Sequence, residues 1–216
     1  MQTSNRRPIR TRSQAWANTL AGRLAKSGLS PNQISLLGIG VSLVGALSLL
    51  TVSSLGNAFF SGLLLIVAAI TVQLRLLCNM LDGLVAVEYG KKSKLGDLFN
   101  EVPDRIEDVL FIVAAGYAAG TSTGVFFGWA AALLSVGTAY VRLLGGSLGF
   151  KQNFCGPLAK PQRMFLLTVT LMATTFQVWI SGGKSFLTFG LLLILIGTFV
   201  TLVRRLFILA NVMSRR

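Results

Sequence analysis

The sequence predicts an all-α integral membrane protein with six transmembrane helices, preceded by an N-terminal amphipathic helix in the membrane interface. Of the 216 residues, 53% are hydrophobic and only 12% are charged, whereas a solvated surface needs roughly 25–35% charged residues. The apolar residues also fall into six segments of the kind that cross a bilayer core of ~30 Å. These segments are residues 34–53, 59–81, 106–119, 125–144, 164–180 and 186–209.

Two short regions precede these segments. Residues 1–12 hold four arginines and no apolar run, so we interpret them as a basic tail and not as a cleaved signal. In residues 13–29, Trp16, Leu20 and Leu24 recur every fourth position while the basic residues lie off that line. This pattern favours an interfacial helix, with an ordinary packed helix as the alternative. A break at residues 30–32 then opens the six-helix domain, residues 30–216.

Basic residues are distributed unevenly between the connections. They gather before the first segment, in every second connection and at the C-terminus, while residues 51–57, 120–124 and 181–185 contain Lys184 alone. By the positive-inside rule, both termini and the acidic stretch between positions 79 and 108, with its candidate active site, face the cytoplasm, as expected for a bacterial inner-membrane protein. The net charge of +13 therefore indicates membrane lipids as partners and no nucleic acid, because no soluble basic domain is visible.

All seven acidic residues lie between positions 79 and 108. If the second span continues as a helix beyond residue 81, Asn79, Asp82, Gly83 and Ala86 share one stripe. That stripe carries two oxygen ligands followed by small residues, which let a phosphorylated ligand approach the backbone. Close packing of helices through small residues is the alternative. The chain has no histidine, so acid–base chemistry would fall to carboxylates.

A second polar stripe follows. Gly96, Asn100, Asp104 and Asp108 recur every four residues, and we expect their helix to begin near residues 100–102, because proline is tolerated in a first helical turn and Pro103 follows directly. Two oxygen-rich stripes on adjacent helices suit a hard divalent cation such as Mg²⁺.

The spacing of the two stripes resembles a known family signature. The chain reads N-x2-D-G-x2-A-V-x8-G-x3-N-x3-D, and the CDP-alcohol phosphotransferase family reads D-x2-D-G-x2-A-R-x8-G-x3-D-x3-D, with spacers of equal length. The resemblance implies a phospholipid-biosynthesis enzyme that moves a phosphatidyl or substituted phosphoryl group from a CDP-linked donor to an acceptor alcohol, releasing CMP. It also implies a homodimer. The matching positions are Asn79, Asp82, Gly83, Ala86, Val87, Gly96, Asn100 and Asp104.

The resemblance assigns roles to these positions. It implies that Asp104 is the catalytic base, and that Gly83, Ala86 and Gly96 contact substrate. It further implies that Mg²⁺ or Mn²⁺, one or two ions, is held by four residues, which here are Asn79, Asp82, Asn100 and Asp104. Asparagine keeps a carbonyl oxygen but loses the charge. We therefore expect weaker metal binding, with one ion where the family holds two, or binding that depends on the nucleotide substrate.

Several charged residues supplement the motif. Glu88, Asp97, Glu101 and Asp108 are near enough in sequence to restore negative charge. Asp108 is also an alternative base.

Basic residues supply further candidate substrate contacts. Arg75 stands one turn before Asn79 inside a span, where it would pair with Asp82 or meet a phosphate, or else snorkel to the surface. Arg142, Lys160 and Arg163 would receive the acceptor's phosphate or a lipid headgroup, or simply anchor helix ends.

Two other functions remain open at this level. One is a catalytically impaired relative that acts in membrane binding or assembly. The other is a small transporter. The residues do not name the acceptor alcohol.

Overall fold

The computed structural model describes residues 15–91 and 93–215, so the predicted basic tail and the first two residues of the interfacial segment lie outside the described residues. In the described ranges every regular element is an α-helix. The helices are α1 (Ala15–Lys26), α2 (Pro31–Val52), α3 (Ala58–Glu88), α4 (Gly96–Ala118), α5 (Ser122–Ser147), α6 (Lys160–Ser181) and α7 (Ser185–Met213).

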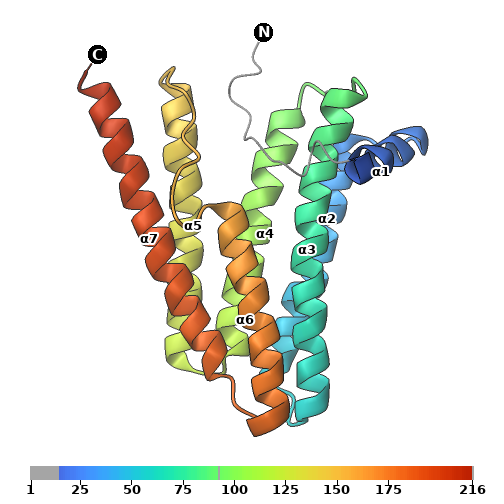
Figure 1. Ribbon diagram of the computed structural model, residues 1–216, viewed down its shortest axis with the longest axis vertical. Coiled ribbons are helices and arrows are strands. Elements are labelled where there is room, and N and C mark those ends of the chain that lie inside the picture. Colours follow the sequence, from blue (N-terminus) through green and yellow to red (C-terminus); the bar gives the residue numbers. More distant parts are fainter. Residues whose placement is uncertain (1–14, 92, 216) are drawn as a thin grey trace.

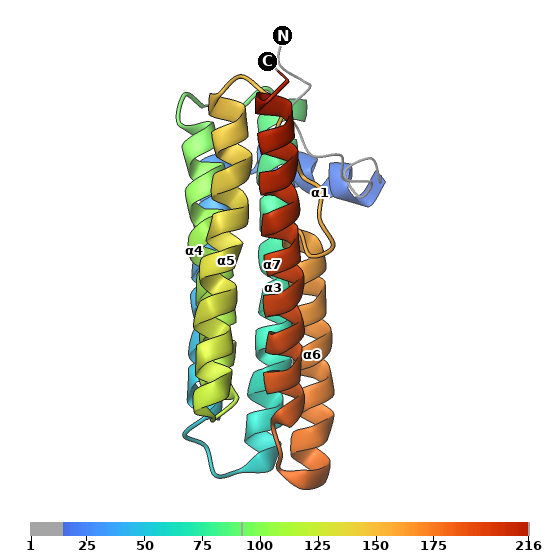
Figure 2. The ribbon, with the colours of Figure 1, turned by 90° about the vertical axis from the view of Figure 1, so that its left-hand side faces the viewer.

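The six long helices form one bundle, and α1 crosses its side near one end (Figures 1 and 2). Helix α4 packs between α2 and α5, α3 packs on α2 and α6, and α7 packs on α5 and α6. The larger of two apolar clusters in the described residues runs through this bundle and includes the fully buried side chains of Leu65, Phe111 and Leu167. The arrangement agrees with the predicted all-helical membrane fold.

Helix α2 begins where the sequence predicts. The Ser30 hydroxyl accepts a hydrogen bond from the Gln33 amide, and the Gln33 side chain accepts one from the Ser30 amide. Pro31 occupies the first turn, where its missing N–H is not needed. This reciprocal cap satisfies two amides that the helix itself leaves without partners.

Helix α1 rests on α3 through small residues. Ala17 and Ala21 are fully buried against an apolar cluster that includes Leu84 and Val85. The Trp16 side chain, in contrast, is half exposed. The end of α3 also holds α1, because the Tyr89 hydroxyl donates to a backbone carbonyl of α1. The structure thus shows a packed face on α1, and its position in a membrane interface stays a prediction.

Five helices, all except α1 and α4, are long and apolar enough to cross a membrane. The core of the bundle nevertheless contains the second half of α4, where Phe111 and Ile112 are fully buried. Where α4 crosses α5, a Cβ added to Gly116 would lie 2.9 Å from the Gly124 carbonyl oxygen and 3.1 Å from the Gly128 Cα. Glycine at this crossing lets the two backbones touch.

The expected start of α4 near residues 100–102 was wrong. The helix begins at Gly96 and contains Pro103 in its interior. Proline removes the hydrogen bond to the carbonyl four residues earlier, but one missing bond does not end a helix whose following turns are buried. The prediction that α3 continues beyond residue 81 is confirmed, because the helix runs on to Glu88.

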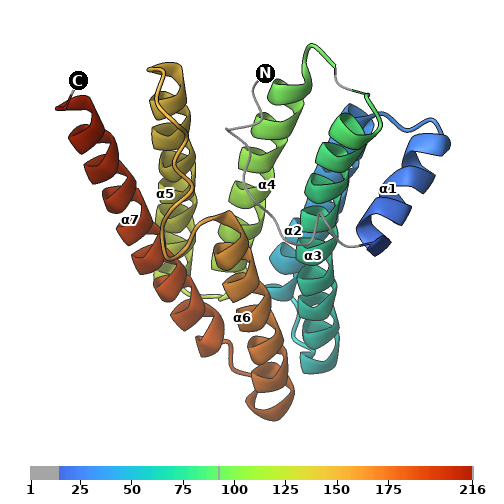
Figure 3. The same cartoon turned by 45° about the horizontal axis from the view of Figure 1, so that its top comes forward.

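The connection between α5 and α6 descends into the bundle before α6 begins, well below the ends of α3, α5 and α7 (Figures 1 and 3). Arg205 of α7 fixes this segment, since its guanidinium donates to the Cys155 carbonyl and to the Thr138 carbonyl of α5. The first residues of α6 are therefore placed within the bundle, beside α4.

Candidate active site

The two polar stripes meet between α3 and α4. The Asn79 amide nitrogen lies 2.6 Å from Asp104 Oδ1 and 3.1 Å from Glu107 Oε2, and donates to both. One side chain of α3 thus joins two carboxylates of α4 that are one turn apart. The sequence motif predicted the meeting of Asn79 and Asp104 but not the part played by Glu107.

Asp82 lies one turn further along α3 and is 4% exposed. Its Oδ2 accepts a 2.7 Å hydrogen bond from the Ser35 hydroxyl of α2, while its buried Oδ1 has no hydrogen-bond partner among the described residues. An unpartnered carboxylate oxygen in a buried place is costly. Asp82 Oδ1 is therefore available to bind a cation or to accept a hydrogen bond from a ligand.

The Asp104 carboxylate is surrounded by donors from three helices. Besides Asn79, the Lys160 ammonium at the start of α6 contacts Oδ1, and Arg105 Nη2 lies 3.3 Å from Oδ2. The descending connection brings Lys160 to this position, which sequence spacing alone could not reveal. Asp104 remains partly exposed, with 14% of its side chain accessible.

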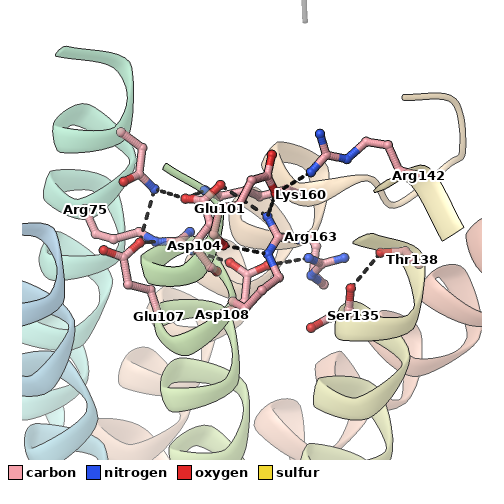
Figure 4. Close-up of polar contacts among 12 residues, drawn as sticks. Arg75, Glu101, Asp104, Glu107, Asp108, Ser135, Thr138, Arg142, Lys160 and Arg163 are labelled. Carbon is pink, nitrogen blue, oxygen red and sulfur yellow. Dashed lines mark hydrogen bonds and ion pairs between the residues drawn. The ribbon is translucent and has the colours of Figure 1, made fainter. Parts of the chain in front are cut away.

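Below Asp104 lies a set of four buried ions, which we call the deep ion cluster: Arg75, Glu107, Asp108 and Arg163, each at most 1% exposed. Arg75 Nε donates to Glu107 Oε2 at 2.6 Å, and its Nη2 contacts Asp108. Arg163 Nη2 donates to the other Asp108 oxygen at 2.5 Å. The cluster links α3, α4 and α6 (Figure 4).

Arg75 neither pairs with Asp82 nor reaches the surface, so these two predictions for Arg75 were wrong. It pairs with Glu107 and Asp108 and not with Asp82, and it does not snorkel to the surface, because α4 supplies buried carboxylates at its own depth. Its Nη2 also donates to the Asp104 carbonyl at 3.2 Å, and its Nη1 has no hydrogen-bond partner among the described residues. A substrate contact of Arg75 or of Arg163 remains a prediction.

Arg142 of α5 and Glu101 of α4 form a second, more exposed ion pair, which we call the rim pair. Arg142 of α5 donates to Glu101 at 2.5 Å and to Gln152 of the descending connection at 2.8 Å. Its guanidinium stands 5.2 Å from the centre of the Phe154 ring. The structure therefore brings Arg142, Lys160 and Arg163 to the acidic stretch. They contact three different carboxylates of α4, which are Glu101, Asp104 and Asp108 in that order.

The remaining motif positions are more open. Gly83 and Ala86 are partly exposed on α3, Gly96 begins α4, and Asn100 is exposed one turn before Asp104. Val87, where the family has arginine, is 38% exposed. We find no contact that brings Asn100 to Asn79 or Asp82 in the described residues, so its place in a ligand set stays a prediction.

The motif supplies two acidic oxygen ligands that a metal ion could bind. Asp82 and Asp104 are acidic oxygen ligands on adjacent helices, and Asp82 Oδ1 is free to coordinate. In the described part of the chain, however, no group of three or more acidic or cysteine side chains is arranged to hold a metal ion. The residues therefore fit an ion whose coordination is completed by oxygens from outside the protein.

Comparison with known proteins agrees with the motif. No model of a known family matches the chain. The chain is 28% identical over 191 residues to an uncharacterized protein of Aquifex aeolicus, covering 87% of this chain and 86% of that protein. It is 26% identical over 193 residues to a phosphatidylinositol phosphate synthase of Streptomyces avermitilis, covering 86% and 74%.

A solved structure has the same fold. The phosphatidylinositol phosphate synthase of Mycobacterium tuberculosis, crystallised with CDP-DAG bound, superposes with a TM-score of 0.73 at 22% identity, over 89% of this chain and 92% of that one. Motif spacing, relatives and fold therefore agree. The chain is similar to phosphatidylinositol phosphate synthases in sequence and in fold, and its motif resembles the CDP-alcohol phosphotransferase signature. It departs from that signature at Asn79 and Asn100, where the signature has aspartate.

Proposed function

We propose that the protein is a membrane transferase of phospholipid biosynthesis. It moves a phosphatidyl or substituted phosphoryl group from a CDP-linked donor to an acceptor alcohol and releases CMP. The observation that carries this proposal is that side chains from three helices converge on the partly exposed Asp104 carboxylate. Asn79 of α3 and Lys160 of α6 contact Asp104 of α4, and Asp82 of α3 lies near enough to interact with it electrostatically.

Asp104 is the proton acceptor in this proposal. The acceptor hydroxyl oxygen attacks the donor phosphorus, the bond from that phosphorus to CMP breaks, and the hydroxyl proton passes to Asp104. Oδ1 is occupied by Asn79 and Lys160, whereas Oδ2 has a single contact with Arg105 at 3.3 Å. Oδ2 is thus the freer oxygen. General-base help of this kind accelerates a reaction roughly 10²- to 10⁴-fold.

A divalent ion belongs to the same proposal. Mg²⁺ or Mn²⁺, when bound, neutralises the charge that develops on the leaving phosphate. Asp82 and Asp104 would hold it, with Asn79 and Asn100 as the further predicted ligands. Because two of the four motif charges are missing, we propose that donor phosphate oxygens complete the site. The M. tuberculosis synthase has also been crystallised with manganese and citrate, which supports a divalent ion.

For the acceptor we propose an alcohol that carries a phosphate. A cavity of about 360 Å³ opens beside the rim pair and is lined by Arg142, Lys151, Gln152 and Arg205 among others. Arginine grips phosphate through two parallel hydrogen bonds. The Streptomyces avermitilis and Mycobacterium tuberculosis proteins are named phosphatidylinositol phosphate synthases, and this name supports a phosphate-bearing acceptor.

We further propose that α2 to α7 all cross the membrane, as the single domain of residues 30–216. The buried apolar half of α4 supports this count. The same proposal orients the motif end of the bundle toward the cytoplasm, because basic residues gather there, and places α1 in the interface of that leaflet.

Release of CMP by the purified protein in lipid tests the function. CDP-diacylglycerol and CDP-alcohols are offered as donors against a panel of free and phosphorylated alcohols. One combination should release CMP, and Asp104→Asn should lower the rate by at least roughly 10²-fold. Asp97→Asn is the matched control, since Asp97 is an exposed acid in the first turn of the same helix. Absence of CMP with every pair, together with no binding of CDP compounds, would favour the impaired relative.

A further inference from the structure

Asn79 differs from the family signature, and its surroundings explain the difference. Its amide nitrogen lies between two carboxylates, 2.6 Å from Asp104 and 3.1 Å from Glu107. An amide can donate to both acceptors at once, whereas an ionised carboxylate can only accept. An aspartate at 79 would thus place a third acceptor where two already meet.

The fold makes a specific space for the Glu107 side chain. A Cβ added to Gly38 of α2 would lie 2.6 Å from Glu107 Oε1 and 3.7 Å from Asn79 Oδ1. The missing side chain at Gly38 thus leaves room for this carboxylate against α2. Oε2 of the same carboxylate accepts from Arg75, so Glu107 is held between α2 and α3 at 0% exposure.

We propose that Asn79 and Glu107 form a matched pair, in which Asn79 is a positioning residue that ties Asp104 to the buried Glu107–Arg75 ion pair. Asparagine at this position is then a working part of the site and not merely a lost metal ligand. Restoring the signature's aspartate at 79 should therefore destabilise this protein and slow its reaction.

The physical reason is charge. Asn79→Asp brings a carboxylate to about hydrogen-bonding distance from both Asp104 and Glu107. Like charges repel strongly in the buried place beside Glu107. It also removes both donated hydrogen bonds. If Glu107 becomes Gln, the new aspartate faces an amide in place of one of its two neighbouring carboxylates, and Asp104 remains as the other. The new aspartate also stands one helical turn after Arg75, which can pair with it. Asn79→Asp with Glu107→Gln therefore keeps the charge of the deep ion cluster while moving it from α4 to α3.

A double-mutant cycle of thermal unfolding tests the pair. The wild type, Asn79→Asp, Glu107→Gln and the double variant are heated in detergent, without metal or nucleotide. Each single variant should lower the midpoint by roughly 5 °C or more. The double variant should unfold above Asn79→Asp, with a total loss smaller than the sum of the two single losses. Additive losses, or an Asn79→Asp midpoint equal to that of the wild type, would overturn the proposal.

Two control variants distinguish a specific effect at the Asn79–Glu107 pair from the general effect of an added charge or an added side chain. Asn100→Asp introduces the same charge at the other divergent motif position, which is exposed, and should leave the midpoint within roughly 1–2 °C of the wild type. Gly38→Ala should lower the midpoint by displacing Glu107, whereas Gly40→Ala on the same helix, with nothing within 4 Å of the added Cβ, should not. An equal change of the midpoint in both glycine variants would show that the room at Gly38 is not what accommodates Glu107.

A kinetic readout tests whether Asn79 positions Asp104, and this part rests on the proposed function. Asn79→Asp should lower kcat for CMP release at least roughly tenfold with little change in KM for the donor. Glu107→Gln in the same chain should leave most of that loss in place, because an aspartate at 79 still cannot donate to Asp104. A loss confined to KM would contradict positioning. The thermal cycle needs no turnover, so failure of the matched pair and failure of the proposed reaction are distinguishable.

Discussion

The deep ion cluster and the rim pair contain the same kinds of residues in different surroundings. In the deep cluster, the arginines and carboxylates are at most 1% exposed, and each arginine reaches a carboxylate of α4. In the rim pair, Arg142 and Glu101 are 10% and 25% exposed. Breaking a buried ion pair leaves a charge without compensation, while an exposed pair contributes little. The deep cluster ties α3, α4 and α6 together through buried charges, so we expect it to matter more for stability than the rim pair.

The largest expected effect is on stability in the deep cluster. Asp108→Asn removes the charge that faces both Arg75 and Arg163, and we expect it to lower the free energy of unfolding by about 3–5 kcal/mol. Denaturant titration in detergent measures the loss. Asp97→Asn, an exposed acid of the same helix, should stay within about 0.5 kcal/mol of the wild type. If the two variants were equally stable, the deep cluster would have no structural role.

Lys160 lies between the two regions and should affect activity more than stability. Its side chain is 16% exposed and contacts Asp104. Lys160→Met should slow CMP release by roughly 10- to 100-fold, because one cation beside the reacting phosphate and the base is lost. Lys160→Arg should recover part of the rate. Steady-state kinetics with the active donor and acceptor would decide, and an unchanged rate in Lys160→Met would remove Lys160 from the site.

The rim pair should show the smallest effect on stability. Glu101→Gln frees Arg142 from its carboxylate, and we expect a change of about 0–1 kcal/mol in the free energy of unfolding. Arg142→Gln should raise KM for a phosphorylated acceptor while KM for the CDP donor stays the same. An acceptor KM that does not respond would place the acceptor away from the cavity beside Arg142.

The sequence predicted the helical bundle well, because apolar segments of spanning length are a strong signal. The predicted start of α4 was wrong, because a proline such as Pro103 is typical of a first helical turn. The buried packing of the following turns keeps the helix intact through this proline. The motif also located Asp82 and Asp104. The role of Glu107 was missed, although it stands three residues after Asp104, because only helix packing shows that it faces Asn79 and Arg75. Likewise, the burial of Arg163 depends on the descending connection before α6.

Calorimetry of Mn²⁺ binding, with and without CDP-diacylglycerol, tests most directly the claim that substrate completes this divergent site. Asp82 and Asp104 are the acidic motif ligands that remain, and in the described residues no larger group of acids is arranged around an ion. We therefore expect weak or no binding of Mn²⁺ to the protein alone and clear binding once the CDP donor is present. Two tight Mn²⁺ sites in the absence of any CDP compound would contradict the account.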